Sequence, residues 1–213
     1  MNDTEPASFN RRAMDWPADN GLALFLCWGD GQMDEALERF KEPAGHQLQG
    51  LHVFADGCYD PVSGHGGWGF VAYLDGVEHA FDFDGSSNST NNTMELLSLF
   101  NAIGWINRES VGGPATIWLD SVYAVNGCNI WRPIWRNNGW RKVRANPKAR
   151  SRKIADAELW RNVDRELLES RLITIAWCKG HSGIYGNERA DALADLGRLS
   201  LRANGDTKKL RNY

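Results

Sequence analysis

Four acidic residues stand where regular elements are expected to begin or end: Asp56, Glu95, Asp120 and Asp191. The first and third close short apolar stretches at 51–56 and 115–120, which have the composition of buried strands. If those strands are neighbours, their acidic ends lie side by side at one sheet edge. Crowded carboxylates repel one another unless cations neutralise them, and hard oxygen ligands suit Mg²⁺ or Mn²⁺ rather than zinc. Because two such ions can clamp the attacking and leaving oxygens of a phosphodiester, the four acids predict a two-metal site for phosphodiester hydrolysis.

Each acid also has an ordinary structural explanation. Asp56 could be a turn residue, since a glycine follows it. Glu95 could return a hydrogen bond to a helix cap at Asn92, and Asp120 could cap the helix that follows it. Asp191, near a helix start, would be favoured by the helix dipole. One site explains all four positions together, and we therefore favour the metal site over four separate structural explanations.

The sequence from residue 51 onward predicts an α/β fold, a five-stranded mixed sheet flanked by helices. The expected strands are 51–56, 68–74, 77–83, 115–119 and 172–178, with a glycine-rich loop over 61–67. The expected helices follow residue 92, begin at Ser121, contain Ile154 to Leu168, and span 187–202. We expect residues 1–50 to be an N-terminal extension of unknown role, 51–203 the main domain, and 204–213 a polar tail.

Composition indicates a globular protein, with 42% hydrophobic and 24% charged residues. The apolar run at 22–28 is too short to cross a bilayer, and no secretory signal precedes it. The four cysteines form no C-x-x-C pair, which favours reduced thiols. We therefore expect a cytoplasmic protein that has no membrane partner, and we expect it to be a monomer.

Positive charge is concentrated in one segment. The net charge is only −3, yet no acid occurs between Asp120 and Asp156, where nine cations lie. Three tryptophans and three arginines alternate there: Trp131, Arg132, Trp135, Arg136, Trp140 and Arg141. Cations that project outward would bind phosphates, and flat rings would contact sugars or bases. The rings could instead be the small core of this segment. We interpret them as mainly structural and the cations as mainly for nucleic acid.

Five short motifs occur in one collinear order over about 51–200: Asp56-Gly57, Thr90 to Leu96, Leu119-Asp120-Ser121, Lys179 to Gly183, and Asn187 to Asp191. Together they resemble type 1 ribonuclease H of the bacterial kind, and the tryptophan-rich segment resembles the basic protrusion of that family. The resemblance implies the ribonuclease H fold. It also implies a metal-dependent endonuclease that cuts the RNA strand of RNA–DNA hybrids and leaves 5′-phosphate and 3′-hydroxyl ends.

By this resemblance, the four acids match the family's metal ligands, with two Mg²⁺ ions as cofactor and Mn²⁺ as the alternative. His181 matches a mobile-loop histidine that assists proton transfer or product release, and Glu188 matches an acid near the metals. Thr90, Asn91 and Asn92 match residues that hold the hybrid. Capping of the following helix is the competing explanation for Asn92.

The chain also departs from the family pattern. Val62-Ser63-Gly64 stands where the family usually has Asn-Pro-Gly, and Asp156 stands where it often has a phosphate-binding asparagine. Residues 1–50 do not resemble the family's hybrid-binding module. Two other functions stay open from the sequence: a metal-dependent DNA nuclease or resolvase of related fold, and a non-catalytic hybrid-binding protein.

Overall fold

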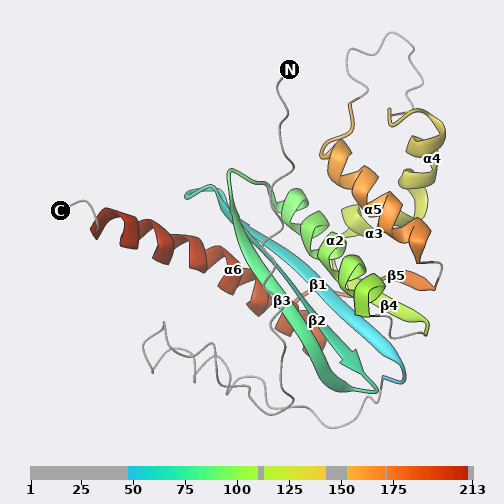
Figure 1. Ribbon diagram of the computed structural model, residues 1–213, viewed down its shortest axis with the longest axis horizontal. Helices are drawn as coiled ribbons and strands as arrows, with labels where there is room; N and C mark the ends of the chain where they lie inside the picture. Colours follow the sequence, from blue (N-terminus) through green and yellow to red (C-terminus); the bar gives the residue numbers. More distant parts are fainter. Residues whose placement is uncertain (1–47, 110–112, 143–152, 171, 211–213) are drawn as a thin grey trace. The chain divides into compact units, whose positions relative to one another are not determined.

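The computed structural model describes residues 48–109, 113–142, 153–170 and 172–210. Its strands are β1 (Leu51–Asp60), β2 (His65–Leu74), β3 (Val77–Ser87), β4 (Ala115–Leu119) and β5 (Ile173–Trp177). They form one five-stranded sheet in the order β3-β2-β1-β4-β5 (Figure 1). The first three strands pair antiparallel, whereas β4 pairs parallel with both β1 and β5. The predicted mixed sheet is thus confirmed. The predicted N-terminal extension lies outside the described residues up to residue 47.

The helices are α2 (Asn91–Glu109), α3 (Val122–Asn126), the π-helical turn η1 (Gly127–Trp131), α4 (Arg132–Asn137), α5 (Ala157–Glu169) and α6 (Tyr185–Leu210). Alternate residues of β1 point to opposite faces of the sheet. Val53 and Ala55 pack in the core that contains Leu99 of α2, whereas Phe54 packs with Leu193 of α6. The two long helices therefore cover opposite faces (Figure 1).

The first three strands run further than the sequence predicts. β1 continues for four residues past Asp56, and β2 begins at His65, inside the predicted glycine-rich loop. Gly57 and Gly67 serve close packing rather than turns, whereas Gly64 lies in the turn with a φ of +71°. A Cβ on Gly57 would collide with the backbone of α2 at Glu95, and a Cβ on Gly67 would collide with the backbone of α6 at Ala194. The helices can therefore lie against the strand backbones.

Helix ends also differ from the prediction. The helix after Ser121 is divided into α3, η1 and α4, and the middle piece passes so close to Trp160 that a Cβ on Gly127 would meet its ring. The last helix begins two residues earlier than predicted and continues to Leu210, beyond the expected end at residue 202. No proline follows residue 147, so nothing in the sequence forces an earlier stop.

The predictions about the cysteines and about membrane-spanning segments can be compared with the described residues. Cys58, Cys128 and Cys178 are free thiols, as predicted, and Cys27 lies outside the described residues. No helix in the described part of the chain is both long and apolar enough to span a membrane.

Candidate active site

Three of the four predicted acids form one cluster. Carboxylate oxygens of Asp56, Glu95 and Asp120 all lie within 4.8 Å of one another. The parallel pairing of β1 with β4 ends at Phe54 and Trp118, and each strand's acid comes two residues later. Glu95 reaches the same place from the second turn of α2, because Gly57 lets that helix lie against β1. Strand register and helix packing thus bring together three acids that are far apart in the sequence.

The structural explanations for these acids do not hold. Thr90, not Asn92, caps α2, because its Oγ1 accepts a hydrogen bond from the Thr93 N–H at 3.2 Å. Ser121, not Asp120, caps α3 by accepting from the Ala124 N–H at 3.3 Å. Asp56 lies within a strand rather than in a turn. A turn or cap role therefore accounts for none of the three.

Electrostatics in the cluster favour a bound cation. Burial, and then repulsion from Asp120 and Asp191, raises the pKa of Asp56 to about 8. Burial, and then repulsion from Asp56 and Asp120, raises the pKa of Glu95 to about 9. The Glu95 Oε2 atom is buried without a hydrogen-bond partner in the described part of the chain. Three carboxylates that repel one another when ionised offer oxygen donors and negative charge, which match the ligand preference of Mg²⁺ or Mn²⁺.

The fourth acid belongs to a neighbouring group. Ligand atoms of His181, Glu188 and Asp191 lie within 4.8 Å of one another, with 3.9 Å between His181 Nδ1 and Asp191 Oδ2. Asp191 also raises the pKa of Asp56, so the two groups interact. Glu188 accepts the Gly183 N–H at 3.2 Å and ties the histidine loop to α6. The His181 side chain is 76% exposed. Its φ of +49° lies in the left-handed region, which is found in turns and loops rather than in regular elements.

Asn187 is a site residue that the sequence interpretation missed. It is 1% exposed, and its Nδ2 donates to Asp120 Oδ2 at 3.4 Å while its Oδ1 accepts from the Cys178 thiol at 3.2 Å. Gly180 leaves the space that the Asp120 carboxylate needs, because a Cβ there would collide with it. An asparagine beside the matched acids was visible in the sequence, but its burial was not. Asn187 therefore holds the Asp120 side chain in place.

The family model for RNase H matches residues 49–198. The chain belongs to the ribonuclease H family. The ribonuclease H of Cupriavidus pinatubonensis is 35% identical over 156 residues, which cover 72% of this chain and 99% of that protein. The ribonuclease H of Paracidovorax citrulli is 36% identical over 146 residues, covering 68% and 91%. Since the match spans nearly the whole of these relatives, the chain is an enzyme of the ribonuclease H type.

Solved structures agree on the fold. The foamy viral protease–reverse transcriptase in complex with RNA/DNA hybrid matches with a TM-score of 0.59 and 23% identity. The match covers 75% of this chain but only 22% of that longer one. At this identity the likeness shows the ribonuclease H fold alone, as the sequence predicted.

The tryptophans of the basic protrusion pack with one another and against the core. Trp135 is 7% exposed, and its ring lies 5.7 Å from that of Trp131 and 5.5 Å from that of the fully buried Trp160. Tyr123 closes the cluster against Trp131 and Trp160. Trp140 packs against the same core. The interpretation of these rings as mainly structural therefore fits Trp135, whose ring is used in packing.

Two of the protrusion's arginines pair with a buried acid, and one of them, Arg132, turns inward, contrary to the prediction that it projects outward. Arg132 Nη1 lies 2.8 Å and Arg136 Nη1 3.2 Å from Oδ1 of the buried Asp164 of α5. The Arg132 side chain is only 17% exposed. Arg141 is exposed, and the cations at 143–152 lie outside the described residues. Arg132 thus joins α4 to α5 rather than offering its charge to a phosphate.

We expect Asp164→Asn to destabilise the fold by about 1–2 kcal/mol, because it removes one charge that serves two arginines. Urea unfolding measures this change. Glu169→Gln, at the exposed end of the same helix, is the matched control and should be neutral. Equal midpoints for the two variants would show that the ion pairs contribute nothing measurable.

The predicted hybrid contacts lie at the start of α2. Thr90, Asn91 and Asn92 are exposed there, and Asn91 Nδ2 donates to Glu95 Oε1 at 3.4 Å. Asp156 lies close by: its Oδ1 accepts from Thr93 Oγ1 at 3.1 Å. It precedes α5 with a left-handed φ of +53° and makes no capping hydrogen bond with its side chain. The polar start of α2 therefore connects the acid cluster to Asp156.

Proposed function

We propose that this ribonuclease H cleaves the RNA strand of RNA–DNA hybrids by two-metal-ion catalysis and leaves 5′-phosphate and 3′-hydroxyl ends. The observation that supports it most is the group of three carboxylates, two of them buried, within 4.8 Å of one another, with one buried oxygen left without a partner among the described residues. In a chain of this family, such a cluster is suited to cations rather than to proton storage.

Asp56, Glu95, Asp120 and Asp191 would hold the ions, with Mg²⁺ as the expected metal and Mn²⁺ as the alternative. When bound, these ions supply a nucleophilic water and neutralise charge on the leaving oxygen. Asn187 fixes the Asp120 carboxylate, and Gly180 leaves room for it. The protein's own contribution is thus a preformed set of oxygen donors that needs little rearrangement to bind cations.

His181 is the proposed proton carrier, because it is exposed on a loop and lies beside Asp191. We expect His181→Ala to slow cleavage by about tenfold to a hundredfold without stopping it, since the acid cluster stays intact. Single-turnover rates on a labelled hybrid measure the effect. His79→Ala, which removes an exposed histidine from β3, is the control. A rate equal to that of the control would remove His181 from the mechanism.

One digest tests the substrate. The chain is incubated with a labelled RNA–DNA hybrid, duplex DNA, duplex RNA and each single strand, with Mg²⁺ or with EDTA. We expect cleavage of the hybrid's RNA strand alone, and only with Mg²⁺. Cleavage of DNA would favour the nuclease or resolvase alternative, and binding without cleavage would favour a non-catalytic hybrid-binding protein. End labelling then distinguishes 5′-phosphate from 5′-hydroxyl products.

Exposed amide and hydroxyl side chains at Thr90, Asn91 and Asn92 support the proposed hybrid contact, because groups that donate and accept can recognise a ribose 2′-hydroxyl. Arg141 is an exposed cation of the protrusion, and we propose that it contacts a phosphate. A monomeric state and a cytoplasmic location stay predictions.

A further inference from the structure

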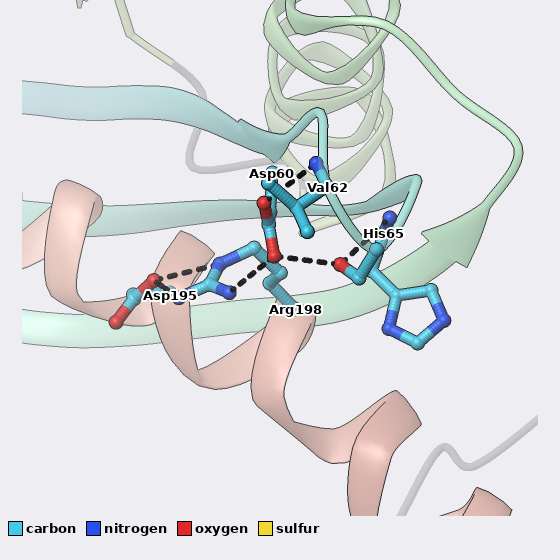
Figure 2. A network of polar contacts seen from close by, with 6 residues as sticks. Asp60, Val62, His65, Asp195 and Arg198 are labelled. Carbon is cyan, nitrogen blue, oxygen red and sulfur yellow. Dashed lines mark hydrogen bonds and ion pairs between the residues drawn. The ribbon is translucent and has the colours of Figure 1, made fainter.

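A single carboxylate organises the turn between β1 and β2. Asp60 Oδ1 accepts the Val62 N–H at 2.9 Å, and Oδ2 accepts the Ser63 hydroxyl at 2.7 Å. The Ser63 Oγ in turn accepts the His65 N–H at 3.3 Å (Figure 2). The Asp60 carbonyl accepts the Gly64 N–H at 2.9 Å. Every residue from 62 to 65 thus depends on Asp60 directly or through one hydroxyl.

Asp60 is itself held by α6. Arg198 Nη1 lies 3.9 Å from Asp60 Oδ2, and Arg198 Nε donates to Asp195 Oδ1 at 2.9 Å (Figure 2). The Arg198 and Asp60 side chains are 17% and 20% exposed, so solvent screens their attraction only in part. The positive charge of Arg198 also partly offsets the rise in the pKa of the Cys58 thiol, two residues before Asp60, so the two groups interact. One guanidinium therefore joins the helix to the end of β1.

The backbone behind Arg198 is fixed to the sheet. A Cβ on Gly67 of β2 would collide with the Ala194 carbonyl and the Arg198 nitrogen, so strand and helix are in backbone contact there. Gly85 of β3 meets Gly197 of α6 in the same way. The Arg198 backbone is therefore held against the sheet, and its side chain reaches the turn from a closely packed position.

The turn leads to an exposed surface suited to nucleic acid. Eight consecutive neutral hydrogen-bonding residues, Ser86 to Thr93, follow the acidic part of β3. Ser87 pairs with His65 in the β2–β3 ladder, and the Asn88 N–H donates to the Gly64 carbonyl at 2.9 Å. The same run reaches the acid cluster through Asn91, which donates to Glu95. We call residues 86–93 the polar run. It is uncharged, so it can approach a phosphodiester backbone beside four acids.

We propose that Arg198 is a positioning residue for nucleic-acid binding: through Asp60 it fixes the β1–β2 turn, and the turn holds the polar run in register beside the acid cluster. This inference rests on the proposed function for its substrate. Arg198 touches neither the acids nor the reacting phosphate, so its loss should weaken binding and leave the chemical step intact.

The first test is a split between KM and kcat on the labelled hybrid with saturating Mg²⁺. We expect Arg198→Met, which keeps most of the stem, to raise KM about threefold to fivefold with kcat within twofold of wild type. Arg198→Lys should recover most of the loss, since it keeps the charge that faces Asp60. Asp195→Asn, which leaves the Arg198–Asp60 pair intact, is the matched control and should keep the wild-type KM. An unchanged KM for Arg198→Met, or a lower kcat with an unchanged KM, would overturn the proposal.

The second test does not depend on cleavage. Amide hydrogen exchange at Val62 and Gly64 should become several-fold faster in Arg198→Met and not in Asp195→Asn. Hybrid affinity is measured on an Asp120→Asn background, where binding is separated from turnover. If wild-type protein does not cut the hybrid, the proposed function fails, while amide exchange still decides the positioning role. Unchanged exchange at both amides would refute that role whatever the substrate.

Discussion

Asp120→Asn should reduce hybrid cleavage by about a thousandfold or more, a loss of roughly 4 kcal/mol of transition-state stabilisation. The substitution removes one anionic donor from a cluster in which three carboxylates lie within 4.8 Å of one another. It keeps the side chain's shape, and the amide oxygen can still accept the hydrogen bond from Asn187. The loss should therefore fall on metal binding and catalysis, and the fold should persist.

The measurement combines single-turnover cleavage with hybrid affinity and thermal unfolding. Affinity in EDTA should stay within a few-fold of wild type, since the predicted contacts at the start of α2 are untouched. Asp82→Asn, the same substitution on the exposed edge strand β3, should cleave at the wild-type rate. If Asp120→Asn cleaves as fast as that control, Asp120 has no part in the reaction.

Glu95→Gln should stabilise the metal-free protein at neutral pH while abolishing activity. Burial and two neighbouring acids raise the pKa of Glu95 from 4.5 to about 9, so its ionised form is disfavoured in the folded state. Keeping such a carboxyl in the folded state at pH 7 costs on the order of 3 kcal/mol, because stability falls by about 1.4 kcal/mol for each pH unit above the unfolded-state pKa. A neutral amide of the same shape removes this cost.

The pH dependence gives the sign of the effect. A raised carboxyl pKa contributes stability that is fully present below the unfolded-state pKa and is lost as pH rises through the folded-state pKa. The wild-type protein in EDTA should therefore lose stability between about pH 4.5 and pH 9, the interval between the ordinary and the raised pKa of Glu95. The difference in Tm between Glu95→Gln and wild type should be near zero at pH 4 and should grow up to pH 9.

Mg²⁺ should reverse this difference, because it binds the wild-type carboxylates and stabilises the folded state by mass action. Glu109→Gln, at the exposed end of the same helix, is the matched control and should follow wild type at every pH. A Glu95→Gln Tm that stays below the wild-type value in EDTA at pH 8 would mean that Glu95 is favourably paired without metal.

The sequence predicted the sheet and the acids because both leave strong local signals. Apolar runs end in acids, and strand register then brings Asp56 and Asp120 together at matching offsets. Glycines misled the prediction at the strand ends, since Asp56-Gly57 resembles a turn. Gly57 is instead inside β1, where α2 approaches too closely for any side chain. A close contact between elements distant in sequence has no local signature.

Side-chain orientation was harder to predict than the positions of the elements. Arg132 looks like a surface cation in the sequence, and only the fold places Asp164 beside it. Trp135 faces the core because Trp160, from another helix, meets it there. Asn187 attracted no role because its partners, Cys178 and Asp120, come from other segments. In each case the deciding partner lies at least nine positions away in the sequence.

The four acids come from different layers of the fold. Asp56 lies within β1 and Asp120 directly follows β4, whereas Glu95 belongs to α2 on one face of the sheet and Asp191 to α6 on the other. Ions shared by these ligands would be non-covalent cross-links through the thickness of the domain. Chelation would then loosen both helices at once, and the cooperativity of unfolding would vary with the free Mg²⁺ concentration.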